Sequence, residues 1–433
     1  MSKIREGYKE TEIGIIPEDW EINCLSEIGS FRKGKGIKKD DVVDSDIQCI
    51  RYGEIYTDYN HFVINTKSFI SEEIAINSVE IEKGDLVLAG SGETLEDIGK
   101  AIAYLGDEKC YVGGDTIIIK PNSYINSLYL SYFLATKQVY SQKRKLGQGN
   151  SIVHLYLDGA KQIKVYLPPL IEQQHIAEIL FTMDAHIEKL DQTIEDYKLL
   201  KKGVMKKLLT EGIGHTEFKE TEIGRIPKEW EVVSLNSLGD TFNGLSGVTK
   251  DDFGSGVPYI PYMNIFSNTR IDLNRMDYVD LSKKKKQNKV KYGDVFFTTS
   301  SETPEEAGMS SVLLDEVSEM YLNSFCFGYR LFNFDLLKPE FARFLLRFDY
   351  VRKEIQKLAQ GSTRFNLSKA NVLKIKVALP TIDEQLEIAN RLEYFENRVQ
   401  LLMNERDDFL ELKKALMEKL LTGNVRVAIR MEG

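Results

Sequence analysis

The sequence holds residue types that could support catalysis or bind a metal, but their spacing matches no such site. The five histidines and four cysteines are scattered without metal-ligand or redox spacing. Ser282 and Lys285 match a Ser-x-x-Lys pattern only inside a run of lysines. Residues 90–92 lack the third glycine of a dinucleotide fingerprint, and the sequence has no phosphate loop and no Asn-Pro-Pro-Tyr or Asp-Pro-Pro-Tyr tetrapeptide. These observations predict a chain with no catalytic or metal site of its own.

The charged residues are acidic in total but basic in places. A formal net charge of -9 argues against a chain that coats nucleic acid through an overall basic surface. Basic residues nevertheless gather in residues 32–39, 143–145 and 283–291. Each cluster alone is more typical of a solvated face than of a binding site.

The elements that must position such residues come in two copies. The segment KETEIGIIPEDWE at residues 9–21 returns as KETEIGRIPKEWE at residues 219–231, an offset of 210. Similarity continues beyond this signature, for example from Gln148-Gly149 to Gln360-Gly361. Because a period near 210 residues is too long for a solenoid repeat, the sequence predicts two whole similar domains.

Each copy closes with a long heptad pattern. Apolar residues recur at a and d positions through residues 171–210 and return 212 residues later in residues 383–422. Lys201 and Lys413 interrupt the two patterns at the same repeat position, and their role stays open. A helix of about 40 residues spans roughly 60 Å, so we expect paired coiled-coil helices rather than ordinary core helices. The expected seam comprises Ile176, Leu180, Met183, Ile187, Leu190, Ile194 and Leu208 in the first helix, and Ile388, Leu392, Phe395, Val399, Leu402, Phe409, Leu416 and Leu420 in the second.

Connectivity predicts how these helices pair. The first helix leads to the second domain, and the second helix leaves that domain in the same way, so it must run back antiparallel to the first. Gly212 and Gly423 follow the last seam residues, where each helix would end. Thr381 with Glu384 forms a capping-box pattern at the start of the second.

Within each copy the signals are mixed, which predicts an α+β fold. Residues 115–120 and 321–331 read as strands, whereas residues 126–144 and 339–358 carry helical spacing, one short helix in each copy. We therefore expect two similar domains separated by two antiparallel coiled-coil helices, related by an internal pseudo-two-fold axis. The expected boundaries are 1–170 and 212–380 for the domains, 171–211 and 381–423 for the helices, and 424–433 for a C-terminal tail.

The N-terminus has no apolar signal region, and no apolar run approaches 18 residues, so we expect a cytoplasmic chain with no membrane partner. Two domains on a rigid rod suit the reading of two separated sites on duplex DNA, whose helical turns repeat about every 34 Å. A two-headed scaffold that does not bind DNA fits the same shape equally well.

Several repeated motifs resemble one protein family. The two copies of Lys-Glu-Thr-Glu-Ile-Gly, the Ile-Pro and Trp-Glu pairs that follow them, Leu-Pro-Pro-Leu-Ile-Glu-Gln at 167–173, and the helices ending in Lys-Leu-Leu-Thr resemble the specificity subunit of type I restriction-modification enzymes. The resemblance covers nearly the whole chain. It implies two target-recognition domains that read the halves of a bipartite DNA target, and helices that dock two adenine-N6 methyltransferase subunits.

The resemblance also implies restriction-translocase subunits in the full complex. S-adenosylmethionine, ATP and Mg²⁺ then belong to partner subunits, and this chain binds no cofactor and is not an enzyme. One alternative is a specificity subunit that serves a restriction-methylation system with a fused catalytic polypeptide. The other is the two-headed scaffold without DNA.

Base reading needs side chains with donors and acceptors on loops that enter a groove, where Arg and Lys suit guanine and Asn and Gln suit adenine. Such residues recur at matching places in both copies. For each of them an ordinary polar turn is the alternative, and Tyr52 and Tyr262 could equally belong to the core. The predicted DNA-binding residues are Arg32, Lys33, Lys35, Lys38, Arg51, Tyr52, Ser91, Glu93, Thr94, Gln148, Asn150, Ser151 and His154 in the first copy, and Asn243, Tyr262, Asn264, Ser301, Glu302, Thr303, Gln360, Ser362, Thr363, Arg364 and Asn366 in the second.

Overall fold

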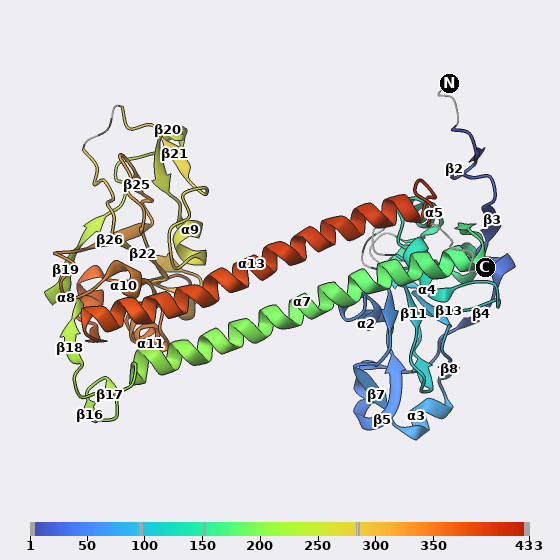
Figure 1. Cartoon of the computed structure of the whole chain (residues 1–433), viewed down its shortest axis with the longest axis horizontal. Helices are drawn as coiled ribbons and strands as arrows, with labels where there is room; N and C mark the ends of the chain where they lie inside the picture. Colours follow the sequence, from blue (N-terminus) through green and yellow to red (C-terminus); the bar gives the residue numbers. More distant parts are fainter. Residues whose placement is uncertain are drawn as a thin grey trace, which may run out of the picture. The chain divides into compact units, whose positions relative to one another are not determined.

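The computed structural model describes residues 5–92, 94, 98–149, 153–282, 284 and 286–427. The chain forms two compact units, which we call unit 1 (residues 1–191 and 404–433) and unit 2 (residues 192–403). Two long helices, α7 (Leu170–Glu211) and α13 (Ile382–Leu420), each contribute one part to either unit (Figure 1). The compact units therefore divide both helices instead of leaving them as separate segments.

Unit 1 joins short strands and short helices to its parts of α7 and α13. Its helices are α1 (Leu25–Ile28), α2 (Tyr52–Thr57), α3 (Glu72–Ile76), α4 (Ser127–Leu134), α5 (Lys137–Leu146) and α6 (Leu157–Lys161). Its strands are β1 (Tyr8–Thr11), β2 (Gly14–Pro17), β3 (Glu21–Cys24), β4 (Gly29–Lys33), β5 (Val42–Ile50), β6 (Phe62–Val63), β7 (Ser68–Ile70), β8 (Val79–Ile81), β9 (Leu86–Ala89), β10 (Ser91–Gly92), β11 (Ala101–Tyr104), β12 (Cys110–Val112), β13 (Thr116–Pro121), β14 (Val153–His154) and β15 (Lys164–Leu167).

Unit 2 repeats this plan. Its helices are α8 (Leu235–Leu238), α9 (Tyr262–Ser267), α10 (Pro339–Leu345), α11 (Asp349–Leu358) and α12 (Lys369–Val372). Its strands are β16 (Phe218–Thr221), β17 (Gly224–Pro227), β18 (Glu231–Ser234), β19 (Gly239–Asn243), β20 (Phe253–Ile260), β21 (Asp277–Val279), β22 (Val295–Thr298), β23 (Ser300–Ser301), β24 (Ser310–Val312), β25 (Tyr321–Leu322), β26 (Cys326–Leu331), β27 (Phe365–Asn366) and β28 (Lys376–Leu379).

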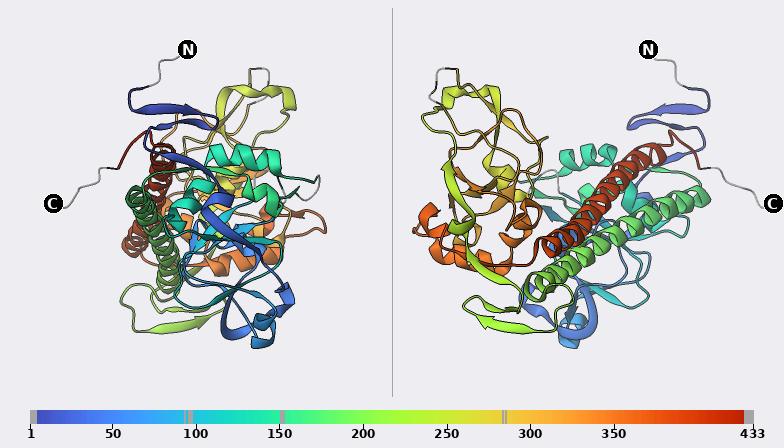
Figure 2. Two further views of the ribbon diagram at one scale, coloured as in Figure 1. Left: turned by 90° about the vertical axis from the view of Figure 1, so that its right-hand side faces the viewer. Right: turned by 60° about the vertical axis from the view of Figure 1, so that its left-hand side comes forward.

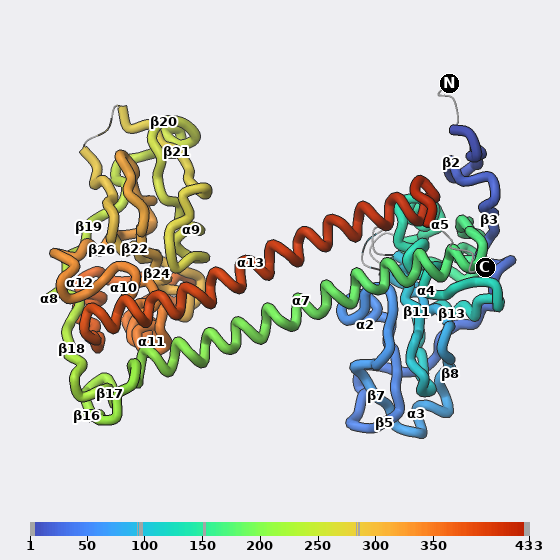
Figure 3. The backbone as a smooth tube through the Cα atoms, in the orientation of Figure 1, coloured from blue at the N-terminus to red at the C-terminus, as the bar shows by residue number. Residues whose placement is uncertain are grey.

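The main sheets of the two units have matching topology. In unit 1 the strand order is β4-β13-β9-β11-β6. In unit 2 it is β19-β26-β22-β24, four strands that are labelled in Figure 3. A second sheet follows the order β7-β5-β12-β8 in unit 1 and β21-β20-β25 in unit 2. The duplication seen in the sequence is therefore a duplication of fold, with unit 1 carrying an additional strand in each sheet among the described residues.

The repeated sequence signature ties the start of each domain to its exit. Strand β3 follows Trp20 and pairs antiparallel with β15, which leads into α7. In the same way β18 follows Trp230 and pairs with β28, which leads into α13. The signature segment thus holds the strand from which each long helix begins.

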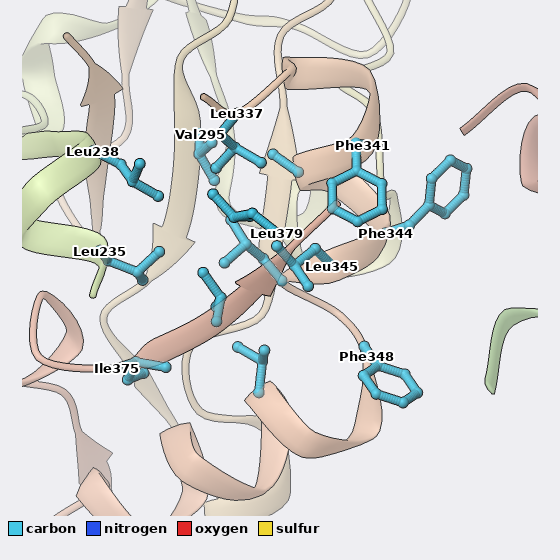
Figure 4. Packing of buried hydrophobic residues seen from close by; sticks show 14 of the residues in the cluster. Leu235, Leu238, Val295, Leu337, Phe341, Phe344, Leu345, Phe348, Ile375 and Leu379 are labelled. Carbon is cyan, nitrogen blue, oxygen red and sulfur yellow. The ribbon is translucent and has the colours of Figure 1, made fainter. Parts of the chain in front are cut away.

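An apolar core lies beneath the main sheet of unit 2. Its residues include several from α8, α10, β22 and β28, so segments far apart in the sequence meet there (Figure 4). Phe341 and Leu345 of α10 and Val295 of β22 are buried in this core. Fully burying such side chains stabilises a fold by about 1.5–3 kcal/mol each, which makes this packing the main support of the domain.

The prediction of one short helix in each copy is wrong, because each stretch divides into two. In unit 1 the break falls between α4 and α5, where Thr136 takes an extended backbone (φ -74°, ψ 158°). The Thr136 hydroxyl donates to the Phe133 carbonyl at 2.8 Å and closes α4. Phe348 makes the corresponding break between α10 and α11. Helical spacing continues across both breaks, so apolar periodicity alone does not reveal them.

Within each unit the two long helices run antiparallel and side by side (Figure 2). In unit 1, Asp184 pairs with Lys413 and Asp191 pairs with Arg406, so the numbering falls on α13 as it rises on α7. In unit 2, Arg398 lies over the ring of Tyr197 and Glu396 pairs with Lys201, which gives the same direction.

The predicted seam residues face inward along both helices. Ile176, Leu180, Ile187, Leu190, Ile194, Leu208, Ile388, Leu392, Leu402 and Leu420 are buried, and Met183, Phe395, Val399, Phe409 and Leu416 are half-buried. Inward-facing residues at this spacing are typical of coiled-coil packing. Over the described residues, no helix has both the length and the apolar character required to span a membrane.

Both long helices end at glycines in the left-handed backbone region. Gly212 has φ +66° and Gly423 has φ +71°. A Cβ atom at Gly212 would lie 2.9 Å from the ring of Trp230, and one at Gly423 would lie 2.5 Å from Pro17. Glycine is required at these ends for the turn and for the close approach of the signature segment.

Candidate nucleic-acid interface

Three of the predicted DNA-binding residues meet in unit 1 on a small two-stranded sheet. Strand β10 pairs antiparallel with β14, which places Ser91 opposite His154. The Ser91 hydroxyl lies 2.9 Å from His154 Nδ1. The backbones of Gln148 and His154 exchange two hydrogen bonds of 3.0 and 2.8 Å, so Gln148 joins the same turn. Regular backbone pairing therefore fixes these three side chains relative to one another.

Unit 2 builds the same arrangement from different residues. Strand β23 pairs antiparallel with β27, with Ser301 opposite Phe365 and Ser300 opposite Asn366. Gln360 and Asn366 exchange backbone hydrogen bonds of 3.0 and 2.8 Å. The turn between them carries Ser362, Thr363 and Arg364, all of which are exposed. Residues that the sequence placed at matching positions thus occupy matching structures.

A cavity opens beside each of these small sheets. The cavity in unit 2 measures about 450 Å³ and is lined by the predicted residues Tyr262, Ser301, Glu302 and Arg364. The one in unit 1 measures about 160 Å³ and is lined by the predicted residues Lys33, Ser91 and His154. The cavities are also lined by residues that the sequence interpretation missed, namely Met263, Phe266, Ser300, Glu306 and Phe325 in unit 2, and Gly34, Gly90, Asp115, Thr116, Ile117, Leu155, Tyr156 and Leu157 in unit 1.

The basic segment of unit 1 lies on and after β4. Lys33, Lys35 and Lys38 are exposed there. Arg32 is exposed as well, but its guanidinium donates to the buried carboxylate of Asp85 at 2.9 Å. The three lysines therefore present their charge to solvent, whereas Arg32 is held by the protein itself.

Two further predicted residues of unit 1 lie at α2. Arg51 donates to the buried carboxylate of Glu54 at 2.6 Å, which holds the guanidinium against the domain. Tyr52 is exposed and therefore does not belong to the core. Thr94 is also exposed. Glu93, Asn150 and Ser151 lie outside the described residues.

In unit 2 the remaining predicted residues divide between surface and interior. Asn243 is exposed and accepts a hydrogen bond from the Lys369 ammonium group. Asn264 is buried, and its amide donates to the carbonyls of Asp272 and Arg275 at 2.8 and 2.9 Å. The amide of Asn264 is thus directed into the domain. Thr303 is exposed beside Glu302.

A tyrosine hydroxyl supports each small sheet from below. The hydroxyl of Tyr262 donates to the Ser300 carbonyl at 2.8 Å, and that of Tyr56 donates to the Ser91 carbonyl at the same distance. Tyr262 is half-buried, as its alternative interpretation allowed. Tyr52 and Tyr262 both begin the corresponding helices α2 and α9, but the hydroxyl contact that Tyr262 makes in unit 2 is made by Tyr56 in unit 1.

Buried cations hold the loops that follow these sheets. In unit 1, the Lys143 ammonium group donates to the carbonyls of Gly99 and Leu134 at 2.5 and 2.8 Å. In unit 2, Arg352 donates to the carbonyls of Gly308 and Ala307 at 2.6 and 2.7 Å. Burial lowers the pKa of Lys143 from 10.5 to about 7. The prediction of a solvated face for residues 143–145 is wrong for Lys143, because this residue is an internal anchor.

The repeated motifs position the cavities by fixing each domain to its long helix. The indole N–H of Trp20 donates to Glu172 at 3.1 Å, and that of Trp230 donates to Glu384 at the same distance. The Thr381 hydroxyl accepts the Glu384 backbone N–H at 3.4 Å, but the Glu384 side chain turns to Trp230. Only half of the predicted capping box therefore forms.

The glutamine next to each of these glutamates completes the attachment. Gln173 donates to the Pro168 carbonyl at 2.9 Å and accepts the Asn126 backbone N–H at the same distance. Gln385 contacts the Pro380 carbonyl and the Lys338 N–H at 3.0 and 2.9 Å. Both glutamines are buried, so the Glu-Gln pair of the motif is a structural joint.

The two lysines that interrupt the heptads bind carboxylates on the opposite helix. In unit 1, Lys413 pairs with Asp184, which also accepts the Tyr132 hydroxyl of α4 at 2.7 Å. In unit 2, Lys201 pairs with Glu396 at 2.6 Å, and Arg343 of α10 lies 3.3 Å from the same carboxylate. Each seam lysine therefore belongs to a network that links both helices and the domain.

The described part of the chain has no cluster of three or more His, Cys, Asp or Glu side chains placed to hold a metal ion. The ring of His61 is buried against Tyr132, and burial lowers its pKa to about 3. His154 and His215 take part in the contacts of the small sheet and of Glu384. The histidines His154 and His215 thus take part in hydrogen bonds between segments of the chain.

Comparison with known proteins agrees with this architecture. The profile of the family described as the type I restriction modification DNA specificity domain matches residues 17–196 and 227–411. The chain is 30% identical to the MjaVIII specificity subunit of Methanocaldococcus jannaschii, with 98% of this chain and 96% of the relative covered. It is 22% identical to the EcoKI specificity subunit of Escherichia coli, covering 97% and 92% of the two chains.

Solved structures show the same fold. The crystal structure of the S subunit of a type I restriction-modification system from M. genitalium superposes with a TM-score of 0.60 at 13% identity, covering 97% of this chain and 98% of that one. A chain from a study of the assembly and conformational transition of the type I R-M system gives a TM-score of 0.54 at 15% identity, covering 95% and 99% of the two chains. Together, the duplicated profile match, the full-length relatives and the shared fold show that the chain belongs to the family of DNA specificity subunits of type I restriction-modification systems, whose members are not themselves catalytic.

Proposed function

We propose that the two small sheets and their cavities are the base-reading surfaces of this subunit, one for each half of a bipartite DNA target. The observation that carries this proposal is the repetition of β10-β14 as β23-β27, with polar side chains at matching places. The frames are alike, but the side chains on them differ. A shared frame with different donors and acceptors suits two readers that bind duplex DNA in the same way and select different bases.

In unit 2, Arg364 has the chemistry to read guanine. Its side chain is exposed on the turn between Gln360 and Asn366, and among the described residues its guanidinium has no internal partner. Arg32 and Arg51 of unit 1 are both held by buried carboxylates. Arg364 is therefore the arginine of the predicted set that is best placed for a bidentate contact to a base edge.

The experiment that tests base reading compares cognate with nonspecific DNA. Arg364→Ala should reduce methylation of the cognate split site by roughly 10- to 100-fold, because a good bidentate contact contributes about 1–3 kcal/mol of discrimination. Binding to nonspecific duplex should change much less. Arg225→Ala, which removes an exposed arginine of β17 that lies outside the cavity and off the long helices, serves as the matched control. Equal losses on both DNAs would contradict the assignment.

We further propose that the long helices dock the methyltransferase subunits. Leu199 and Leu200 of α7 and Tyr394 and Leu401 of α13 are large apolar residues that are more than half exposed within unit 2. Single exposed leucines are common on soluble proteins, but several on one pair of helices are typical of an interaction surface. S-adenosylmethionine, ATP and Mg²⁺ would then be bound by the methyltransferase and restriction subunits.

Docking can be tested separately from DNA reading. Leu199→Glu with Leu401→Glu should abolish copurification of the methyltransferase subunit, since buried charges at an interface are strongly unfavourable. Ile76→Glu, at an exposed position of α3 in unit 1, should leave copurification intact. Retention of the methyltransferase by the double variant would contradict this docking surface.

A further inference from the structure

Asp115 and Phe325 occupy the same position in the two repeats. Each directly precedes an inner strand of its main sheet, β13 in unit 1 and β26 in unit 2. The Gly90 backbone N–H donates to the Asp115 carbonyl at 2.7 Å, and the Thr299 N–H donates to the Phe325 carbonyl at 3.0 Å. Gly90 and Thr299 are in turn the residues just before β10 and β23. The same hydrogen bond therefore places both side chains at the edge of the proposed base-reading surface.

In unit 2 this position presents an aromatic ring to solvent. Phe325 is 63% exposed, and it lines the unit 2 cavity together with Met263 and Arg364. The Phe325 backbone N–H donates to the Asn323 side chain at 2.8 Å, which fixes the turn that carries the ring. Two exposed apolar side chains beside the exposed Arg364 provide an apolar contact next to a hydrogen-bond donor.

In unit 1 the same position presents a carboxylate. Asp115 is exposed and lines the unit 1 cavity with Lys33 and His154. Its backbone lies in the left-handed region (φ +56°), which aspartate tolerates better than most residues. Within the described ranges, the Asp115 carboxylate has neither an ion-pair nor a hydrogen-bond partner. The Asp115 carboxylate is thus a hydrogen-bond acceptor that, within the described ranges, is left for a ligand.

The base edges in the major groove offer one partner for each of these groups. The C5-methyl of thymine is the apolar group exposed there, and the exocyclic amino groups of cytosine (N4) and adenine (N6) are donors. We infer that this shared position is a specificity-determining residue in both domains. Phe325 contacts a thymine methyl in one half-site, and Asp115 accepts a hydrogen bond from an exocyclic amino group in the other. The inference rests on the proposed function of the two surfaces.

The ring of Phe325 can be tested by removing a single methyl group from the DNA. The assay is methylation by the complete methyltransferase complex on cognate duplexes in which each thymine is replaced in turn by deoxyuridine. At one position of one half-site, the wild-type complex should lose about three- to fivefold in kcat/KM, the effect of one apolar carbon. In Phe325→Ala the ratio between thymine and deoxyuridine at that position should fall to about one.

Phe332→Ala is the matched control, because Phe332 is a phenylalanine of unit 2 with similar exposure, 66%, that does not line the cavity. This variant should keep the wild-type ratio. If Phe325→Ala does not assemble with the methyltransferase, Phe325→Leu retains an apolar side chain of smaller area and should give an intermediate ratio. A wild-type complex indifferent to every thymine methyl, or an unchanged ratio in the Phe325 variants, would overturn the assignment.

The carboxylate of Asp115 has a corresponding test in the other half-site. Replacing cytosine by 2-pyrimidinone, or replacing by purine any adenine other than the one that accepts the methyl group, removes the exocyclic amino group. At one position the wild-type complex should lose at least fivefold in kcat/KM with one of these analogues, which also identifies the base. In Asp115→Ala the loss should vanish, whereas Asp107→Ala, a change at a highly exposed aspartate outside the cavity, should retain it. A loss that persists in Asp115→Ala would overturn this part.

Failure of this inference differs from failure of the proposed function. If the two surfaces do not read bases, the wild-type complex will not distinguish the cognate half-sites from scrambled ones. If wild type distinguishes them but the Asp115 and Phe325 variants respond to the analogues as wild type does, base reading stands and these two residues are not its determinants.

Discussion

Units 1 and 2 perform the same structural tasks with different residues. The carboxylate that begins each long helix, Glu172 or Glu384, accepts a tryptophan N–H in both units. In unit 1 it also pairs with Arg426, which follows α13, whereas in unit 2 it contacts His215, which follows α7. The geometry of the joint is therefore kept while its chemistry changes.

The same contrast appears at the buried aspartate of each main sheet. Asp85 is paired with Arg32 of β4 in unit 1, whereas Asp294 is paired with Arg330 of β26 in unit 2. Burial raises the pKa of both carboxyl groups, and the arginine opposes that effect. The arginine that pairs with this aspartate therefore lies on different strands in the two units, and the ion pair is kept in both. In these joints and ion pairs, the location of the contact is therefore the same in both units, whereas the residue types that make it differ.

Breaking the helix network of unit 1 should lower the free energy of unfolding more than any other change proposed for the joints and networks. Asp184 and Lys413 have side chains only 10% and 11% exposed. Asp184→Ala should lower the free energy of unfolding of unit 1 by about 3–5 kcal/mol, because Lys413 would be left buried without its partner. The two tryptophans, one in each unit, allow each to be followed alone. Urea unfolding in a Trp230→Phe background reports on Trp20.

Unit 1 should regain most of this stability in the double variant Asp184→Leu with Lys413→Met, because no buried charge then remains unpaired. If the double variant is as unstable as Asp184→Ala, the ion pair is not the cause of the loss.

The corresponding double variant in unit 2 should recover less. There Arg343, with a side chain 4% exposed, shares Glu396 with Lys201. Lys201→Met with Glu396→Leu removes the pair and leaves the buried Arg343 with the more distant Glu393, at 3.7 Å, so unit 2 should remain about 2 kcal/mol less stable than wild type. Unfolding in a Trp20→Phe background measures this through Trp230. Full recovery would show that the two networks are equivalent after all.

Loss of the contacts at the start of each long helix should change the free energy of unfolding by a smaller amount, and by different amounts in the two units. Arg426→Ala removes the pairing of Glu172 and of Asp19, so it should cost about 1–2 kcal/mol in unit 1. His215→Ala should cost less in unit 2, because Glu384 keeps the Trp230 indole and the Ile213 N–H. Thermal unfolding of the two variants beside wild type checks the order. A larger loss from His215→Ala would reverse the comparison.

The smallest effect concerns the buried loop anchors and pH. The pKa of Lys143 is about 7 in the folded chain and near 10.5 when solvated. Between these values the unfolded state binds more protons, so this residue makes stability rise with pH, by less than about 1.4 kcal/mol per pH unit. The stability difference between wild type and Lys143→Met should therefore shift in favour of wild type from about pH 7 to about pH 8.

The anchor of unit 2 provides the control. Burial also lowers the pKa of Arg352, but a guanidinium remains protonated throughout this range. Arg352→Met should therefore show no such change with pH. A pH dependence that is the same for both variants would exclude Lys143 as its source.

Much of the framework could be predicted from the sequence because repeated patterns report on packing. The heptads identified residues such as Leu180 and Leu392, which are buried in the apolar cores that the long helices share with their domains. Gln148 and Gln360 were likewise matched by their position within the repeat, and both form the corresponding bridge at the start of a turn. Such inferences succeed where local periodicity and tertiary packing require the same residues.

Other features depend on contacts that a linear pattern does not contain. Asn264 looked like an adenine reader, but its amide is used by a loop several residues away. Phe325 and Asp115 are different residue types, so comparison of the two sequence copies could not match them. The match appears only in the structure, where the same backbone hydrogen bond holds each residue beside its small sheet. The identical Trp-Glu joints would have been found by asking which repeated polar residues could reach the repeated tryptophans.

Single-molecule mapping of N6-methyladenine, in cells that depend on this chain for specificity, shows whether the two alike frames read different halves of one DNA target. We predict a split motif in which Gln148→Ala with His154→Ala relaxes the bases of one half only, and Arg364→Ala with Asn366→Ala relaxes only the other. A motif in which both pairs of substitutions alter the same half, or neither alters any base, would contradict this assignment.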